Sequence, residues 1–435
     1  MISVAEALEK LFALAPVMDV ESVPIRNAAG RVLAQSVAAR LTQPPFAASA
    51  MDGYAIWGVK VAPGDSFEVI GEAQAGRGFE GTLGKGQAVR IFTGAPVPKG
   101  SELVVIQEDV DRGGDRITVK DSLGAGHNIR PAGGDFLKGA EFAAPRLLKP
   151  ADVALLAAMN IAEVPVYRRP EIAIISTGDE LVQPGEEPGP DQIIASNAYG
   201  LAALIEAQGG IPRLLPIARD DRASLEMVFD LAKGADIVVT IGGASVGDYD
   251  LVGKVAAERG MDRAFYKVAM RPGKPLMAGR LDGAMMIGLP GNPVSAMVCG
   301  TVFLVPVMRA TLGLGAAPAP RVQMALADPV EANGPREHYM RARITGGQIA
   351  AAKRQDSALL SVLASADALL IRPPYDPARG AGEMVDDSIT ALRRTETATN
   401  AFFDDLAAWL ERDGHGSVRI PVPGVVDNPL SPALR

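Results

Sequence analysis

The chain has 435 residues, of which 48% are hydrophobic, and its 43 basic and 51 acidic residues give a formal net charge of −8. This length predicts roughly three domains, and the hydrophobic content excludes wholesale disorder. The negative charge does not suit nonspecific binding to nucleic acid or to an anionic membrane, so we expect neither as a partner.

Three features of the sequence indicate a cytoplasmic protein. The N-terminal segment "MISVAEALEKLFALAP" carries Glu6 and Glu9 and lacks the basic region of a signal peptide. No uninterrupted apolar run approaches the ~20 residues that a membrane-spanning helix needs. The single cysteine, Cys299, excludes intrachain disulfides, and its position in "NPVSAMVCGTVFLVP" predicts a structural role in a buried helix.

The first elements along the chain are a helix and then a β-rich segment. A helix is predicted over residues 3–14, where Ser3 and Glu6 have the spacing of a capping box. From residue 45 to 145, short β-like runs ("FEVIGEA", "QAVRIFTG", "ELVVIQEDV", "DRITV") alternate with Gly-rich turns, which predicts a small β domain. The segment "PADVALLAAMNI" then returns to a helical pattern.

Strands and helices alternate from about residue 170 to 315. The apolar runs "EIAIIST", "PRLLPIA", "DIVVTIGG" and "AMMIGL" are each followed by a helical segment. This rhythm predicts a doubly wound, mainly parallel sheet with helices on both faces, an α/β/α domain. Ligands of such sheets bind beyond the carboxyl ends of the strands, where this sequence has the loops "STGDEL", "GGASVGDYD" and "GLPGNPVS".

After the linker "LGLGAAPAP" a second β-rich segment extends to about residue 394, followed by a tail with one amphipathic helical pattern. The chain is therefore predicted to be a multidomain α/β protein. The predicted domains are an N-terminal helical and extended region (1–45 plus 141–168), an inserted β domain (46–140), the α/β domain (169–316), a C-terminal β domain (317–394) and a tail of unknown role (395–435).

The residues available to bind a metal ion are mainly carboxylates. The three histidines are scattered and the sequence has no H-x-x-x-H or Cys-x-x-Cys pair, so a zinc site is not predicted. A metal ion would be held by oxygen, which favours Mg²⁺. Glu180 and Asp250 are candidate ligands, although Asp179 and Glu180 could instead cap a turn and Asp250 could cap a helix.

The segment Gly243-Ala-Ser-Val-Gly247 allows two interpretations. As G-x-S-x-G it matches the nucleophile elbow of serine hydrolases, with Ser245 as nucleophile and His338 or His415 as base. The two aspartates that follow it, however, would repel an acyl oxyanion. As an anion-binding loop, it would use backbone N–H groups at Gly242, Gly243 and Gly247 to hold a phosphate at a helix N-terminus.

Two further loops carry groups suited to an oxyanion. "MRPGKP" places Arg271 and Lys274 around a tight turn, and "GLPGNPVS" places Ser295 near the start of a helix. Each also has a structural explanation, as a solvated turn or as a helix cap. Taken together, the strand-end loops supply carboxylates, hydroxyls and cations, which are the groups that a metal-assisted phosphoryl-type reaction requires.

Seven segments in this order closely resemble the molybdopterin molybdenumtransferase family, to which MoeA and the E domain of gephyrin belong. They are "PPFAASAMDGYAI", "IFTGAPVP", "NIRPAGGDF", "STGDEL", "GGASVGDYD", "PGKP" and "GLPGNPVSA", and the resemblance spans roughly residues 1–390. It implies a molybdopterin-binding type of α/β domain, a C-terminal β-barrel-like domain and an elongated homodimer. It also implies insertion of molybdate into adenylyl-molybdopterin with release of AMP, and suggests contact with the molybdopterin adenylyltransferase.

The resemblance assigns roles to individual residues of this chain. It implies that the functional acids are Asp52, Asp135, Glu180, Asp220 and Asp250, with Lys267 as a further catalytic cation, and we expect Asp250, Glu180 and Asp52 to hold Mg²⁺. The implied oxyanion pocket draws on Arg271, Lys274, Pro275, Ser295, Arg341 and Ser357, and Ser245 joins the anion-binding loop.

The sequence also departs from the family pattern. Arg271 stands where lysine is common, Ala47 and Ala48 occupy positions that are usually polar, and Gly134 replaces the acid that normally precedes Asp135. These departures leave the main acids in place but allow an alternative from another class, a non-catalytic molybdopterin-binding or scaffold paralogue. Retention of the main acids favours the enzyme.

Overall fold

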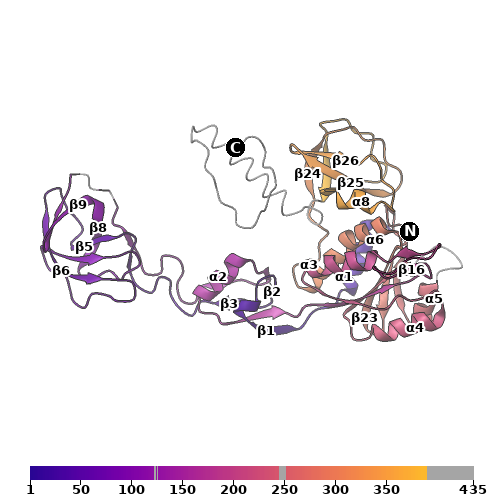
Figure 1. Cartoon of the computed structure of the whole chain (residues 1–435), viewed down its shortest axis with the longest axis horizontal. Coiled ribbons are helices and arrows are strands. Elements are labelled where there is room, and N and C mark those ends of the chain that lie inside the picture. The colour runs from indigo at the N-terminus through magenta and orange to yellow at the C-terminus, as the bar shows by residue number, and fades with distance from the viewer. Residues whose placement is uncertain (122–123, 125, 244–250, 389–435) are drawn as a thin grey trace. The chain divides into compact units, whose positions relative to one another are not determined.

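The computed structural model describes residues 1–121, 124, 126–243 and 251–388, which form two compact units (Figure 1). One unit contains residues 1–17, 170–311 and the chain from residue 315, and the other contains residues 18–169 and 312–314. The candidates Ser245, Gly247 and Asp250 and the tail from residue 395 lie outside the described residues.

The centre of the first unit is a six-stranded sheet in the order β18-β15-β19-β23-β22-β20. The first four strands run parallel, which confirms the predicted doubly wound sheet, and β22 runs antiparallel to both of its neighbours, β23 and β20. The strands are β18 (Ile211–Leu214), β15 (Glu171–Ser176), β19 (Ile237–Ile241), β23 (Ala284–Leu289), β22 (Met277–Leu281) and β20 (Asp262–Tyr266).

The antiparallel edge of this sheet was not anticipated from the sequence. Strands β22 and β23 are joined through Asp282 and Gly283, whose φ angles of 51° and 83° are both positive. Two consecutive positive φ values are typical of the tight turn that joins a β-hairpin, and Asp-Gly is a favoured pair for it. The letters "LDGA" therefore carried a hairpin signal.

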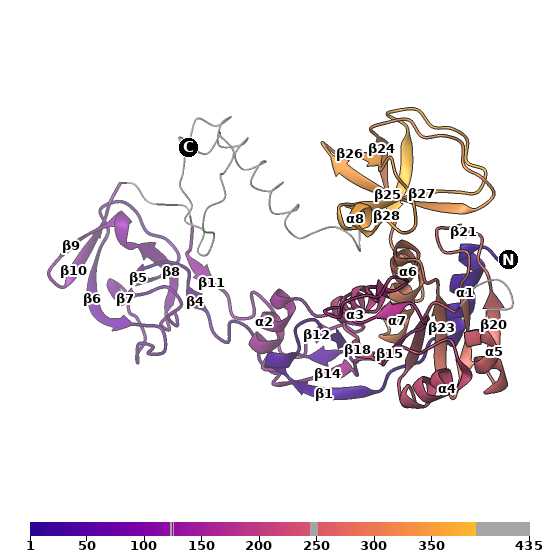
Figure 2. The same ribbon diagram turned by 45° about the vertical axis from the view of Figure 1, so that its right-hand side comes forward.

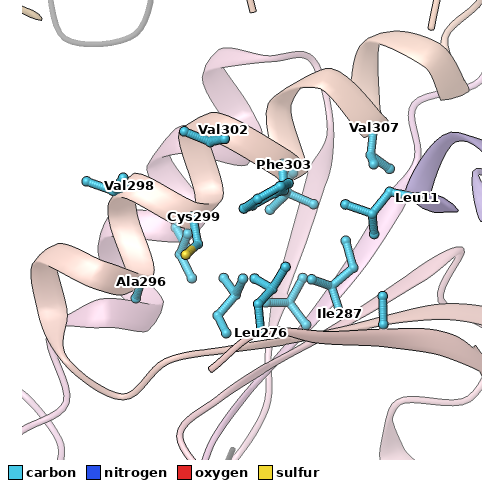
Figure 3. Close-up of a cluster of buried hydrophobic side chains, with 14 of the residues drawn as sticks. Leu11, Leu276, Ile287, Ala296, Val298, Cys299, Val302, Phe303 and Val307 are labelled. Atoms are coloured by element: carbon cyan, nitrogen blue, oxygen red, sulfur yellow. The ribbon is translucent and has the colours of Figure 1, made fainter. Parts of the chain in front are cut away.

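Helices cover both faces of the sheet (Figure 2). Buried side chains of α4 (Arg222–Leu231) and α5 (Leu251–Glu258) form one core with one face of the sheet. A second core lies on the other face (Figure 3), and Cys299 is fully buried within it, so its predicted structural role is confirmed. The helices of this core are α1 (Val4–Leu14), α3 (Asn197–Ala207), α6 (Pro293–Cys299) and α7 (Val305–Thr311), with a π-helical segment η3 (Gly300–Leu304) joining α6 to α7.

The continuous helix over Pro293–Thr311 belongs to this core. Within the described residues it is the one helix that is long and apolar enough to cross a membrane by length and composition, with a mean hydropathy of 1.6. However, 83% of that window is buried inside the protein. Its apolar character is therefore explained by packing against the sheet.

Helix α1 packs with the α/β domain. The capping box is confirmed, since the Ser3 hydroxyl accepts a hydrogen bond from the Glu6 N–H at 3.1 Å and the Glu6 carboxylate accepts one from the Ser3 N–H at 2.7 Å. Leu8 and Leu11 are buried in the same core as Cys299. The predicted domain of residues 1–45 therefore does not form one body, because residues 1–17 and the chain from residue 18 fall in different units.

The described residues of the second unit form two larger sheets and two two-stranded sheets, which pair β4 (Ala48–Ser49) with β11 (Ile129–Arg130) and β3 (Val37–Ala38) with β12 (Glu141–Phe142). The six-stranded sheet has the order β8-β5-β7-β6-β10-β9 and two buried cores, and it corresponds to the β-like runs of the sequence. The four-stranded sheet has the order β1-β14-β2-β13 and packs with α2 (Pro150–Ala158). The strands are β8 (Ser101–Ile106), β5 (Gly53–Trp57), β7 (Gln87–Ile91), β6 (Ser66–Ala73), β10 (Arg116–Val119), β9 (Val110–Gly113), β1 (Val20–Pro24), β14 (Glu163–Tyr167), β2 (Val32–Leu33) and β13 (Arg146–Leu147).

The C-terminal β domain is a closed barrel, as predicted. Its five strands follow the order β25-β26-β24-β28-β27, and pairing of β25 with β27 closes the ring. A short strand from the α/β domain, β21 (Met270–Arg271), pairs in parallel with the start of β25. The barrel strands are β24 (Val322–Leu326), β25 (Glu337–Thr345), β26 (Gln348–Ala351), β27 (Ala368–Arg372) and β28 (Met384–Ser388).

Candidate functional site

The loops that follow β15, β19 and β23 meet at the carboxyl edge of the sheet. The Thr177 N–H donates to the Ile241 carbonyl at 3.0 Å, and the Gly242 N–H donates to the Leu289 carbonyl at 3.1 Å. The side-chain amide of Asn197 donates to the Gly291 carbonyl at 2.7 Å. These bonds bring the three chemistry-bearing loops together where parallel sheets of this type bind ligands.

Two glycines of the predicted phosphate loop have a structural reason to be glycine. Gly242 and Gly243 have φ angles of 93° and 64°, in the left-handed region. A Cβ on Gly242 would lie 2.8 Å from the Thr177 carbonyl oxygen, and one on Gly243 would overlap the Val252 side chain. The chain can therefore make this close turn after β19 only with glycine at both positions.

An acidic group lies beside these loops. The Asp220 N–H donates to an Asp179 carboxylate oxygen at 3.1 Å, and the Glu180 carboxylate lies against the α-carbon of Gly178. The pKa of Asp220 is raised, first by burial and then by the negative charges of Asp179 and Glu180. The structure thus brings the predicted acids Glu180 and Asp220 together.

The nearby cation does not neutralise this acidic group through an ion pair. The Arg219 guanidinium donates to two backbone carbonyls, those of Asp179 at 2.8 Å and Leu181 at 3.3 Å. Asp221 has a different role, because its carboxylate caps α4 by accepting from the Ser224 N–H at 2.8 Å. The described residues contain no cluster of three or more His, Cys, Asp or Glu side chains arranged to hold a metal ion.

A buried arginine is the main feature of the cationic side of the site. Arg341, on β25, is 0% exposed, and its Nη2 donates to the Asp356 carbonyl at 3.1 Å. Its Nε and Nη1 have no hydrogen-bond partner within the part of the chain that the structure describes. Burial and the charge of Arg271 lower the pKa of Arg341. A buried guanidinium with unsatisfied N–H groups is suited to an anionic ligand.

The loop of residues 352–357 holds Arg341 in place. The Gln355 side chain accepts from the Arg341 N–H at 3.0 Å and donates to the Arg341 carbonyl at 2.9 Å. Gln355 therefore continues the hydrogen bonding of β25 beyond the end of β26. The carbonyl of the next residue, Asp356, accepts a hydrogen bond from the Arg341 guanidinium. The sequence contains no pattern that pointed to Gln355, since its partners lie on another strand.

The same loop reaches the first turn of α6. The Ser357 carbonyl accepts from the Val294 N–H at 3.0 Å, and the Ser357 hydroxyl accepts from the Asn292 amide at 3.2 Å. Ser295, on that first turn, is buried. The predicted residues Ser295, Ser357 and Arg341 are thus joined through loop 352–357, and Asn292 is a contributor that the sequence did not reveal.

The loop that carries Arg271 and Lys274 packs on α6. Its backbone is held by a bond from the Val268 N–H to the Lys274 carbonyl at 3.0 Å. Gly273 has a φ angle of 108°, and a Cβ there would overlap the Cys299 sulfur. Pro275 follows within the same loop, and the side chains of Arg271 and Lys274 are exposed. The loop therefore presents two cations to solvent from a tightly packed backbone.

The remaining predicted residues lie elsewhere. Lys267 has a φ angle of 73°, and its Nζ lies 5.0 Å from the centre of the Tyr266 ring. Asp52 belongs to the second unit, where its carboxylate accepts from the Thr93 N–H and hydroxyl at 2.7 and 2.8 Å, and these bonds lower its pKa. Asp135 also belongs to that unit, and its N–H donates to the Gln43 carbonyl at 3.0 Å.

His338 does not resemble the base of a serine hydrolase. It is 8% exposed on β25, paired in register with Arg271 on one side and Arg372 on the other. Its pKa is lowered to about 4, first by burial and then by the charges of Arg271, Arg341, Arg336 and Arg372. A catalytic base needs a carboxylate to orient and stabilise its imidazolium, whereas these neighbours are cations.

Family models match almost the whole described chain. The model "MoeA N-terminal region (domain I and II)" matches residues 2–160, and "MoeA C-terminal region (domain IV)" matches residues 323–387. Between them, "Probable molybdopterin binding domain" matches residues 173–310. The chain belongs to the molybdopterin molybdenumtransferase family. Its α/β domain, inserted β domain and C-terminal barrel are those of this family.

Relatives and solved structures agree with this family. The chain is 38% identical over 353 residues to a molybdopterin molybdenumtransferase of Nostoc sp., covering 78% of this chain and 81% of the relative. It is 36% identical to that of Haemophilus influenzae, covering 68% and 74%. A molybdopterin biosynthesis MoeA protein from Pyrococcus horikoshii is 30% identical with a TM-score of 0.76, covering 89% of this chain and 99% of that one. The protein is therefore a transferase of molybdenum cofactor biosynthesis. This family assignment replaces the two alternatives, a serine hydrolase and a non-catalytic scaffold.

Because Arg341 has no ion-pair partner within the described residues, we expect its replacement to abolish molybdate binding without lowering the stability of the fold. Arg341→Met should leave the free energy of unfolding unchanged within about 1 kcal/mol or raise it, because the variant no longer buries an unpaired charge. Wild-type protein at a molybdate concentration 100 times its Kd should gain about 2.7 kcal/mol, and the variant should gain nothing. Thermal unfolding with and without molybdate measures both effects.

The matched control is Arg343→Met, two residues along the same strand, where the arginine is exposed and donates to the Ser365 carbonyl. This control should keep its stabilisation by molybdate. A large loss of stability in Arg341→Met, together with a retained response to molybdate, would show that Arg341 has a structural role instead.

Proposed function

We propose that the protein inserts molybdate into adenylyl-molybdopterin, cleaving the phosphoanhydride and releasing AMP. The observation that carries this proposal is Arg341, a fully buried guanidinium with two unpaired N–H-bearing nitrogens in the described structure. Such a group is costly unless an anion binds it. The protein's membership of the molybdopterin molybdenumtransferase family supports molybdate as the anion.

The cationic side of the site suits a tetrahedral dianion. Arg341 offers N–H donors from the barrel, and the first turn of α6 offers Ser295. Arg271 and Lys274 supply positive charge from their loop. Arg271, where lysine is common, keeps that charge and adds a planar, forked set of donors that can bind two oxygens at once. We assign these groups, with Ser357 and Pro275, to binding and orienting molybdate.

The acidic side of the site suits a divalent cation. Glu180 and Asp220 lie together without an ion pair to Arg219, and the pKa of Asp220 is raised first by burial and then by the negative charges of Asp179 and Glu180. Mg²⁺ prefers such carboxylates together with water. When bound, Mg²⁺ would neutralise charge on the phosphoanhydride and activate it for cleavage. We assign Glu180 and Asp220 to this cation, together with Asp250 as the sequence indicates.

The cationic side and the acidic side of the site have different roles in the proposed reaction. The arginine and hydroxyl groups hold the incoming oxyanion, and the backbone N–H groups of the glycine loop at Gly242 and Gly243 bind phosphate. The carboxylates hold the cation that the leaving phosphate needs. Catalysis in this arrangement rests on orientation and charge, which is the usual basis of phosphoanhydride chemistry in proteins.

The direct test of this function is release of AMP from adenylyl-molybdopterin. Purified protein should release AMP when Mg²⁺ and molybdate are both supplied, and the product should contain molybdenum. Chelation should stop the release, and Mg²⁺ should restore it. If the protein binds the adenylylated pterin and releases nothing under any of these conditions, the proposed reaction is wrong.

Adjacent aspartates provide a matched pair for testing the acidic site. Asp220→Asn should lower the rate of AMP release by at least about 10²-fold, or 2.7 kcal/mol of barrier, because it removes a carboxylate from the cation site. Asp221→Asn should have little effect, because asparagine caps a helix as well as aspartate does. Initial rates at several Mg²⁺ concentrations separate weaker metal binding from slower cleavage. Equal rates of AMP release for the two variants would show that Asp220 does not bind the cation.

We also propose that the protein is a cytoplasmic homodimer that contacts the molybdopterin adenylyltransferase, as the family resemblance suggests. The chain has a mass of 45.3 kDa. Light scattering at micromolar concentration should therefore give about twice this mass. A mass of one chain across the accessible concentration range would rule out the dimer.

A further inference from the structure

The inserted β domain contains a cavity of about 300 Å³, and none of the residues assigned to the reaction lines it. One wall is the edge strand β8 of the six-stranded sheet, where Leu103 and Val105 are 8% and 2% exposed. His127 and Asn128 also line the cavity, and both are bonded to this strand. The Val104 N–H donates to the His127 carbonyl at 3.0 Å, and the Asn128 side-chain amide donates to the Val104 carbonyl at 2.9 Å. The wall is therefore fixed by hydrogen bonds, and its side chains give the cavity an apolar lining.

Asp109 lines the same cavity and is buried, with an exposed fraction of 9%. One of its carboxylate oxygens accepts from the Gly124 N–H at 3.0 Å, but Asp109 forms no ion pair within the described residues. Lys120 lies beside it, since the Lys120 N–H donates to the Asp109 carbonyl at 2.9 Å. The Lys120 ammonium group instead pairs with Asp111 at 3.4 Å and donates to the Glu108 carbonyl at 3.0 Å. A buried carboxylate without a cation is costly, so Asp109 is suited to a cationic group of a ligand.

A positive charge also lines the cavity. Lys60, three residues after β5, is exposed and forms no ion pair with Asp109 or with any other acid in the described part of the chain. Its flexible stem lets the ammonium group reach an anionic group bound at the cavity. The cavity thus offers a carboxylate, an ammonium group and apolar walls, and the two charges do not neutralise each other.

This set of groups does not suit the ligands of the molybdenum reaction. The buried carboxylate of Asp109 would repel both molybdate and the phosphates of adenylyl-molybdopterin. A metal ion is not favoured either, because the described residues contain no cluster of three or more His, Cys, Asp or Glu side chains that could hold one. The volume lies at the lower end of the range for small-molecule sites, about 300 Å³, so the ligand is a small organic molecule.

We propose that this cavity binds a small zwitterion with an apolar body, of which an α-amino acid with an aliphatic side chain is the simplest case. The ammonium group of the ligand donates to the Asp109 carboxylate, and its carboxylate meets the Lys60 ammonium group. Its side chain packs against Leu103 and Val105. This binding site lies in a different unit from Arg341, and the proposal does not depend on the proposed function.

The test uses the full-length protein, titration calorimetry and three probes that share one aliphatic body. L-leucine carries both charges, 3-methylbutylamine lacks the carboxylate, and 4-methylpentanoate lacks the ammonium group. Wild-type protein should bind leucine at least about tenfold more tightly than either of the other two, because each of them loses one charge-assisted contact.

Two substitutions remove the charges of the cavity one at a time. Asp109→Asn should weaken leucine at least about tenfold and leave 4-methylpentanoate unchanged, since that probe has no ammonium group to lose. Lys60→Met should likewise weaken leucine and leave 3-methylbutylamine unchanged. The matched controls are Asp115→Asn and Lys85→Met, at exposed positions of the same domain, and both should bind all three probes as wild-type protein does.

The pattern across the probes separates recognition from damage to the fold. A disrupted cavity would weaken leucine and 4-methylpentanoate equally in Asp109→Asn, and that result would overturn the proposal. It is also overturned if wild-type protein does not bind leucine up to the solubility limit, or if either of the other probes binds as tightly as leucine. Should Asp109→Asn fail to fold, the three probes on wild-type protein and on Lys60→Met decide the question by themselves.

Discussion

The site depends on the burial of a positive charge that the protein itself does not neutralise. Arg341 is fully buried, it forms no ion pair within the described residues, and burial lowers its pKa. A charge removed from water in this way costs several kcal/mol, which a fold selected only for stability would avoid by using an apolar side chain. The surrounding structure therefore holds Arg341 in place at the expense of stability, and under the proposed function this cost is offset when molybdate binds.

The hydrogen bonds around Arg341 show how this is done. Gln355 binds both backbone polar groups of Arg341, so the strand is fixed at the position where its partner strand has ended. The same loop then binds the guanidinium through the Asp356 carbonyl and reaches the first turn of α6 through Ser357. Loop 352–357 thus links Arg341 of the barrel to the first turn of α6 in the α/β domain. A change in that loop would shift Arg341 and Ser357 together.

The fold was predictable wherever neighbouring residues determined it. Apolar strands alternating with helices predicted the parallel sheet, and the spacing of Ser3 and Glu6 predicted the capping box of α1. The sequence did not show that α1 packs in the core with Cys299 or that β22 forms an antiparallel edge, because both depend on contacts between distant segments. Within the candidate site, residue type and loop position indicated Glu180, Arg271, Lys274 and Ser295 as candidates, whereas Arg341 and Asp220 were implied only by the family resemblance. Gln355 and Asn292 were not predictable, since an amide acquires its role only from the partners that the fold brings to it.

The charged side chains at the sheet edge are arranged differently from the ion pairs on the rest of the α/β domain surface. Elsewhere on the α/β domain acids and bases pair directly, as Arg259 does with Asp230 and Asp282. At the site, Arg219 donates to backbone carbonyls instead of to the acids beside it, and Arg341 likewise binds a backbone carbonyl. Direct pairing would stabilise the free protein but would have to be broken before either ligand could bind. Keeping the acids and the cations apart leaves both groups without a direct ion pair to each other. Under the proposed function, the acids would hold the divalent cation that a phosphoanhydride needs and the cations would hold molybdate, so each ligand could bind without first breaking an ion pair.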